Sequence, residues 1–67
     1  MGRTVRLVLY GAPITPIENH IITRENFIGQ VVGWHVPTGE LRVRFGDVQT
    51  GVVYVWLETT QLELVPL

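Results

Sequence analysis

The chain contains no cysteine, no serine and no lysine. Without cysteine it has neither disulfides nor thiolate metal sites, two of the devices that stabilise small domains. With serine missing as well, the two commonest side-chain nucleophiles are absent. The two histidines, His20 and His35, are too few and too widely spaced for a structural zinc site, and the six acidic residues form no acid–base motif. The sequence therefore predicts no metal, no cofactor and a non-enzymatic role.

Charge is also scarce in this protein. Charged residues make up 16% of the chain, against about 25% in a typical domain, whereas hydrophobic residues make up 46%. The net charge is −1 and all five basic residues are arginine, which argues against a nucleic-acid partner. A small domain with few charges is expected to expose an apolar patch, and such patches often mark contact surfaces.

Long apolar runs are missing too. None approaches the roughly 20 residues of a membrane span, so we expect no membrane association. The N-terminus lacks the apolar core of a signal peptide, and a cytoplasmic location is expected. The 67 residues predict a single domain over 1–67. Because a chain this short buries only about 60% of its unfolded surface, a partner protein or a homo-oligomer is expected to support it.

The residues that are present favour strands. β-branched and aromatic residues dominate, and no segment keeps a helical periodicity. Strands are predicted at residues 3–10, 27–36, 40–45, 52–57 and 62–65. Residues 11–26 contain prolines and predict a long loop, which Ile21 and Ile22 would attach to the core. Residues 58–61 suit a short 3₁₀ turn.

The order of these elements indicates the fold. A strand, a long loop, a three-strand meander, a 3₁₀ turn and a last strand predict an all-β, five-stranded SH3-like barrel with a long loop between strands 1 and 2. A five-stranded OB-fold competes, but it normally has a helix after its third strand, and the connection at 46–51 is too short for one. Gly29 and Gly33 in the second strand indicate a bulge or a bend.

Alternation along the strands predicts an outer face. In the third strand, Arg42 and Arg44 lie on the side opposite Leu41, Val43 and Phe45, and arginine rarely enters a core unpaired. In the fourth strand, the aliphatic side is the better core candidate. The turn at 37–39 is expected to bring the second strand's tryptophan beside Arg42. The expected binding strip is Trp34, Arg42, Arg44, Tyr54 and Trp56.

Two interpretations of this strip remain open. Tryptophan, tyrosine and arginine are enriched at the energetic centres of protein interfaces, which predicts a contact surface. Aromatic–arginine pairs across strands also stabilise sheets that bind nothing. A bulge in the second strand would change the facing of Trp34, which would then belong to the core.

Residues 29–34, Gly-Gln-Val-Val-Gly-Trp, resemble a stretch of the plasmid-borne type II dihydrofolate reductases, and residues 62–65 resemble that family's ending. The resemblance implies an SH3-like homotetramer with a central pore that binds NADPH and dihydrofolate. The family's pore motif, Val-Gln-Ile-Tyr, falls here on Tyr54, Val55, Trp56 and Leu57. Because its glutamine and tyrosine are not reproduced, no catalytic residue is transferred.

The strand around Val43, Arg44 and Phe45, followed by a glycine-containing turn and the Leu-Glu-Leu-Val ending, is also similar to the PsaE-type accessory subunits of photosystem I. That resemblance implies docking on a larger assembly. The leading hypothesis is a small protein-interaction or assembly module that contacts a partner or itself. The alternatives are a pore enzyme resembling the type II reductases and a weak nucleic-acid binder that uses Trp34, Trp56 and Arg42 to stack bases.

Overall fold

The computed structural model describes residues 3–9 and 14–66. These residues form a predominantly β structure of five antiparallel strands with one short helix. The elements in chain order are β1 (Thr4–Leu7), α1 (Pro16–Arg24), β2 (Ile28–His35), β3 (Glu40–Asp47), β4 (Gly51–Leu57), the 3₁₀ turn η1 (Thr59–Gln61) and β5 (Leu62–Leu64). The five expected strands and the 3₁₀ turn are therefore confirmed, with ends that differ by at most two residues except in β1, which ends at Leu7. Residue 10 of the expected first strand lies outside the described residues.

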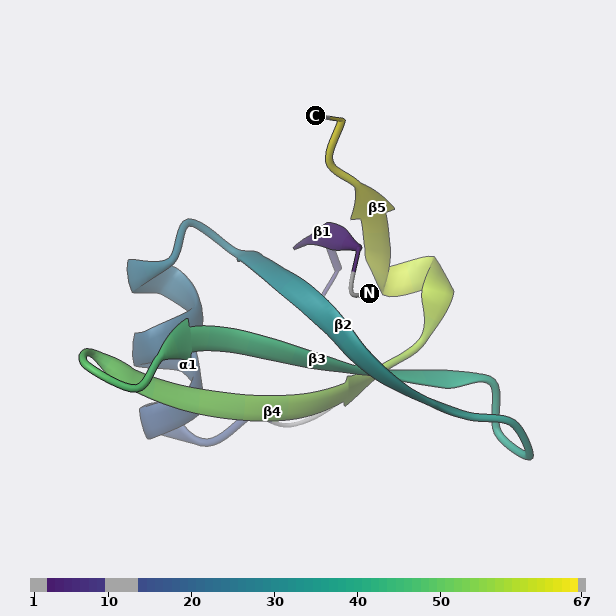
Figure 1. The fold of residues 1–67 in the computed structure, drawn as a ribbon, viewed down its shortest axis with the longest axis horizontal. Helices are drawn as coiled ribbons and strands as arrows, with labels where there is room; N and C mark the ends of the chain where they lie inside the picture. The colour runs from purple at the N-terminus through teal and green to yellow at the C-terminus, as the bar shows by residue number, and fades with distance from the viewer. Residues whose placement is uncertain (1–2, 10–13, 67) are drawn as a thin grey trace.

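The strands form one sheet in the order β4-β3-β2-β1-β5. β2 is the shared strand, because its first half pairs with β1 and its remainder with β3, and Gln30 takes part in both. Figure 1 shows the meander β2–β3–β4 on one side, with β1 and β5 crossing above it. Over the described residues no pairing joins β5 to β4, so the sheet is not closed into a barrel.

The expectation of a loop throughout residues 11–26 is wrong, because residues 16–24 form α1. Residues 11–13 lie outside the described part of the chain. Pro16 was interpreted as a loop signal, but it occupies the first turn of the helix, where proline is favoured. The buried residues of the helix, Ile21 and Ile22, are adjacent, so they do not show the spacing of three or four residues by which a helix is recognised in sequence.

A capping box begins this helix. The backbone N–H of Glu18 donates to Thr15 Oγ1 over 3.2 Å, and the backbone N–H of Thr15 donates to Glu18 Oε1 over 3.0 Å. These bonds satisfy donors that the first helical turn leaves without partners. The chain then reverses into β2 through Asn26 and Phe27, whose φ angles of 58° and 64° are left-handed.

The core lies between α1 and the meander. Its fully buried side chains are Ile22, Val43, Phe45 and Leu57, with Val5, Leu7 and Ile21 around them. The predicted inward facing of Val43 and Phe45 is confirmed, and Leu41 packs against the same cluster while remaining partly exposed. Ile21 and Ile22 attach their segment to the core as expected, but from a helix. In the part of the chain that is described, no helix is long and apolar enough to cross a membrane.

The two strand glycines have different roles. A Cβ at Gly29 would lie 2.7 Å from the carbonyl oxygen of Arg44, so β2 approaches β3 more closely than a side chain allows. Near Gly33 the register between β2 and β3 shifts, which confirms the expected bulge. The bulge determines the facing of every residue that follows it in β2.

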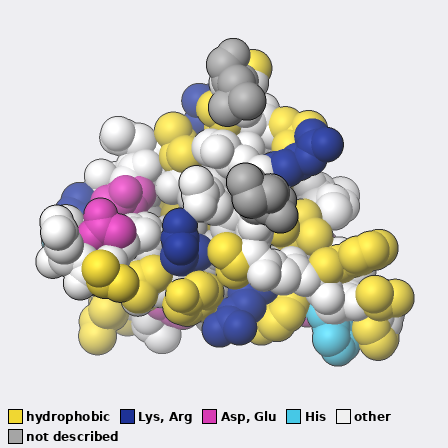
Figure 2. Space-filling model, viewed as in Figure 1, with side chains coloured by type: hydrophobic (Ala, Val, Ile, Leu, Met, Phe, Trp, Pro, Cys, Tyr) yellow, Lys and Arg dark blue, Asp and Glu magenta, His cyan; other side chains and the backbone are white. Residues whose placement is uncertain are grey.

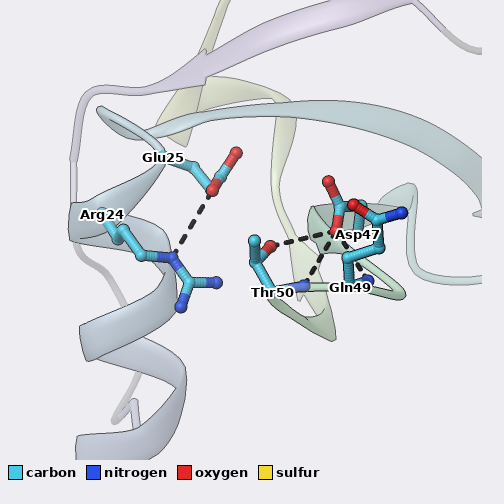
Figure 3. A network of polar contacts seen from close by, with 5 residues as sticks. All are labelled: Arg24, Glu25, Asp47, Gln49 and Thr50. Carbon is cyan, nitrogen blue, oxygen red and sulfur yellow. Dashed lines mark hydrogen bonds and ion pairs between the residues drawn. The ribbon is translucent and has the colours of Figure 1, made fainter.

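The turn between β3 and β4 is organised by Asp47. One carboxylate oxygen accepts from the backbone N–H of Gln49 over 2.8 Å, from the backbone N–H of Thr50 over 2.9 Å and from Thr50 Oγ1 over 3.1 Å. Figure 3 shows these three bonds, with the Arg24–Glu25 ion pair beside them. The bonds from Thr50 and Gln49 hold the pKa of Asp47 below its ordinary value, and the charge of Arg24 adds to this effect.

Candidate functional site

The outer side of β3 and β4 carries four of the five residues expected in the binding strip. Arg44 pairs with Tyr54 and Arg42 with Trp56, so all four lie on one side of the sheet. Val53 and Val55, which alternate with the aromatic residues, pack against the core. Tyr54 and Trp56 each remain 45% exposed. We call Arg42, Arg44, Tyr54 and Trp56 the outer face.

Trp34 does not belong to the outer face. The register pairs Arg42 with Gly33 and Trp34 with Leu41, so Trp34 lies on the side of Leu41 and Leu57. The expectation that it lies beside Arg42 is wrong, because His35 and not Val36 pairs with Glu40. The connection between β2 and β3 therefore spans residues 36–39 in place of the expected 37–39, and one added residue reverses the facing of the strand residues next to it. Its alternative place in the core is also excluded, since Trp34 is 66% exposed near the end of β2.

His35, and not Trp34, is the ring of β2 that lies on the outer side. It pairs with Glu40 on the outer side, and its ring meets Trp56 edge to face, with centroids 6.0 Å apart and planes at 73°. The Nδ1 atom of His35 lies 2.9 Å from Thr38 Oγ1 in the adjoining turn. Sequence reasoning argued against a metal site at His35 and gave it no place on this face. A connection of four residues, 36–39, in place of three would have assigned it there.

Arg42 stacks on an aromatic ring. Its guanidinium carbon lies 4.4 Å from the ring centroid of Tyr54, which is the diagonal neighbour and not the directly paired residue. Such a cation–π contact is worth about 0.5–1 kcal/mol when exposed. The contact places the guanidinium of Arg42 over the ring face and so restricts where its N–H groups can lie.

Arg44 is oriented by a different contact. Its Nη2 donates to Gln30 Oε1 over 2.8 Å, which links β3 to β2 on the outer side. Ion pairs within residues 3–9 and 14–66 join Arg6 to Glu63 and Arg24 to Glu25, and involve neither arginine of the outer face. The outer face therefore presents two cations that no carboxylate of the described chain neutralises.

The surroundings of the outer face are mostly uncharged. Figure 2 shows arginine and hydrophobic side chains interspersed over the meander, while the largest group of acidic side chains in this view lies at the α1 end. Glu40 is the exception on the outer side of β3, and its Oε1 accepts from Thr38 Oγ1 over 3.3 Å. The surface combines flat aromatic area with oriented guanidinium groups.

The described residues offer little for other chemistry. They contain no group of three histidine, cysteine, aspartate or glutamate residues placed to hold a metal ion. A shallow hollow of about 200 Å³ is smaller than most ligand pockets, which run from about 300 Å³ upward. Its lining consists of Thr4, Glu25, Ile28, Gly29, Gln30, Arg44 and Gly46.

Comparison with known proteins identifies no relative. No protein-family model matches the chain, and neither a curated protein nor a solved structure matches it. Inferences about the outer face therefore depend on its geometry and its charge.

Proposed function

We propose that this protein is a small non-enzymatic interaction or assembly module that contacts a partner, or a second copy of itself, through the outer face. The observation that carries the proposal is the pair Tyr54 and Trp56, half exposed on a rigid sheet and flanked by an oriented Arg42. Tryptophan, tyrosine and arginine dominate binding energy at interfaces. Their fixed geometry lowers the entropy that association would otherwise cost.

The same proposal includes an SH3-like architecture. The strand order β4-β3-β2-β1-β5, the shared strand β2 and the 3₁₀ turn before β5 support it. In this arrangement α1 replaces the long first loop and covers the core. The outer side of the meander is then the broad surface left available to a partner.

Affinity capture tests the proposed function. The full chain, Trp56→Ala and Trp34→Ala are immobilised in parallel and exposed to an extract of the source organism, and bound proteins are quantified by mass spectrometry. We expect an identified protein to bind the wild type and Trp34→Ala, and to bind Trp56→Ala at least about tenfold less, since interface tryptophans often contribute 2 kcal/mol or more. Trp34 is the matched control because it is exposed on the other side.

Native mass measurement separates the two kinds of partner. Size-exclusion chromatography with light scattering is run on the wild type and on Trp56→Ala. A dimer that Trp56→Ala dissociates would identify a second copy as the partner. Equal capture by the wild type and Trp56→Ala, with both proteins monomeric, would contradict the proposed function.

A further inference from the structure

The outer side of β3 has a distinct charge order. Glu40, Arg42 and Arg44 follow one another at every second residue, so a negative group precedes two positive ones. Strand geometry separates successive members by roughly 7 Å. An extended partner segment has the same period, so carboxylates two residues apart on it can meet both arginines. The spacing on this chain thus defines the spacing required of a partner.

The two guanidinium groups are oriented before any partner arrives. Arg42 is held over the ring of Tyr54, and its N–H donors can form a two-pronged carboxylate contact. Arg44 is held by Gln30 through Nη2. The ion pairs of the described chain engage neither of them.

We infer that the partner is a protein with an extended acidic segment, whose carboxylates at positions i and i+2 bind Arg42 and Arg44 while its apolar side chains contact Tyr54 and Trp56. This inference rests on the proposed function and names the chemistry of its partner. Glu40 repels acidic groups at its end of the row, so the partner's carboxylates lie toward Arg44.

A second copy fits the outer face less well. A two-fold contact centred on Arg42 pairs Glu40 of each copy with Arg44 of the other, but it places the two Arg42 guanidinium groups against each other. The register that pairs Glu40 with Arg42 of the other copy leaves Arg44 and Tyr54 outside the contact. An acidic segment meets both arginines without that contact between like charges, so charge complementarity favours a different, acidic protein.

A nucleic-acid strand is also a poorer occupant. Affinity for a phosphate chain grows with the number of phosphates that basic residues neutralise. The outer face offers two cations, Glu40 lies in line with them, and the whole chain has a net charge of −1. A peptide with two correctly spaced carboxylates, by contrast, can be fully paired by the two arginines of the outer face.

Peptide selection tests this inference. A displayed library of random dodecapeptides is selected on the full chain and counter-selected on Trp56→Ala. Sequences that depend on Trp56 are expected to carry Asp or Glu at i and i+2. A synthetic consensus peptide and its Asn/Gln counterpart are then measured by fluorescence anisotropy on the wild type, Arg42→Gln, Arg44→Gln and Arg6→Gln. Arg6→Gln removes the same charge from an exposed arginine outside the outer face.

We expect Arg42→Gln, and separately the amide peptide, to weaken binding about tenfold, in keeping with hydrogen bonds between charged groups. Arg6→Gln should change it less than twofold. Affinity should fall as sodium chloride rises from 50 to 300 mM. Peptides that need Trp56 but contain no acidic pair, or that bind Arg42→Gln as well as the wild type, would overturn the inference and leave the proposed surface intact.

Two further measurements decide between occupants. A dimer that Trp56→Ala dissociates would identify a second copy as the occupant in place of an acidic protein. A twelve-nucleotide oligothymidylate that displaces the selected peptide at lower concentration than the unlabelled peptide does would identify a nucleic acid as the occupant. If no peptide depends on Trp56 and no protein is captured through it, the proposed function fails, and the inference fails with it.

Discussion

Gly29 shows how one residue controls the distance between two strands. A Cβ there would lie 2.7 Å from a carbonyl oxygen and 2.8 Å from a side-chain carbon of Val43. We expect Gly29→Ala to lower the free energy of unfolding by about 1–3 kcal/mol, the usual cost of overpacking. Urea denaturation measures it, with Gly33→Ala as the control, since its nearest contact is 3.4 Å away. Equal losses in both variants would contradict this explanation.

Asp47 makes stability depend on pH. Its pKa in the folded protein lies below the ordinary value of 3.8, chiefly because Thr50 and Gln49 donate to the carboxylate. A group with a depressed folded pKa stabilises the native state above its unfolded pKa, and this contribution is lost as pH falls through the folded pKa. We expect Asp47→Ala to be less stable than wild type at neutral pH.

The stability difference between wild type and Asp47→Ala should shrink as pH falls below the ordinary carboxyl value of 3.8. Denaturation curves at several pH values from 7 down to 2 measure this difference. If the stability difference between the two proteins stays constant from pH 7 to pH 2, the negative charge of Asp47 does not contribute to stability, and this prediction is contradicted.

At the scale of elements, the start of α1 depends on Thr15. Thr15→Ala removes the hydroxyl that accepts from the backbone N–H of Glu18, and loss of an N-cap costs about 1 kcal/mol. Thr23→Ala changes the same residue type within the helix, outside the cap. We expect chemical denaturation to show a loss for Thr15→Ala and none for Thr23→Ala, because alanine is the better helix former. The reverse order would contradict the role of the cap.

Neighbouring residues of β4 should differ sharply in their effect on stability. Leu57 is 1% exposed and Trp56 is 45% exposed. We expect Leu57→Ala to cost about 2–5 kcal/mol, whereas Trp56→Ala should cost less than about 1 kcal/mol, since only cross-strand contacts are lost. Thermal denaturation measures both. A small loss for Trp56→Ala also keeps that variant folded for the binding experiments.

Prediction from sequence succeeded best for elements with a period of two. β3 and β4 were located, and Val43 and Phe45 were assigned to the core, because alternation is a local property of the strand. α1 was missed because its apolar pair packs against distant strands, and that packing stabilises a helix too short to be recognised by periodicity.

At the scale of the whole molecule, the core is small. Seven hydrophobic residues are buried in the described chain, which is consistent with the limited burial available to a domain of this size. A partner that binds only the native state should therefore stabilise it measurably. At a free concentration 100 times its Kd, it should add about 2.7 kcal/mol to the free energy of unfolding. Calorimetry should show this gain for the wild type and not for Trp56→Ala.

The sequence by itself determined the exclusion of disulfide and thiolate chemistry, the strand pattern, and the shared facing of Arg42, Arg44, Tyr54 and Trp56. These properties follow from composition and from local alternation. Tertiary structure decided the facing of Trp34, the place of His35 beside Trp56 and the stacking of Arg42 on Tyr54. The reason is that register depends on how strands pair and on the length of the turn that joins them, and one added residue in a turn or a bulge reverses every facing beyond it.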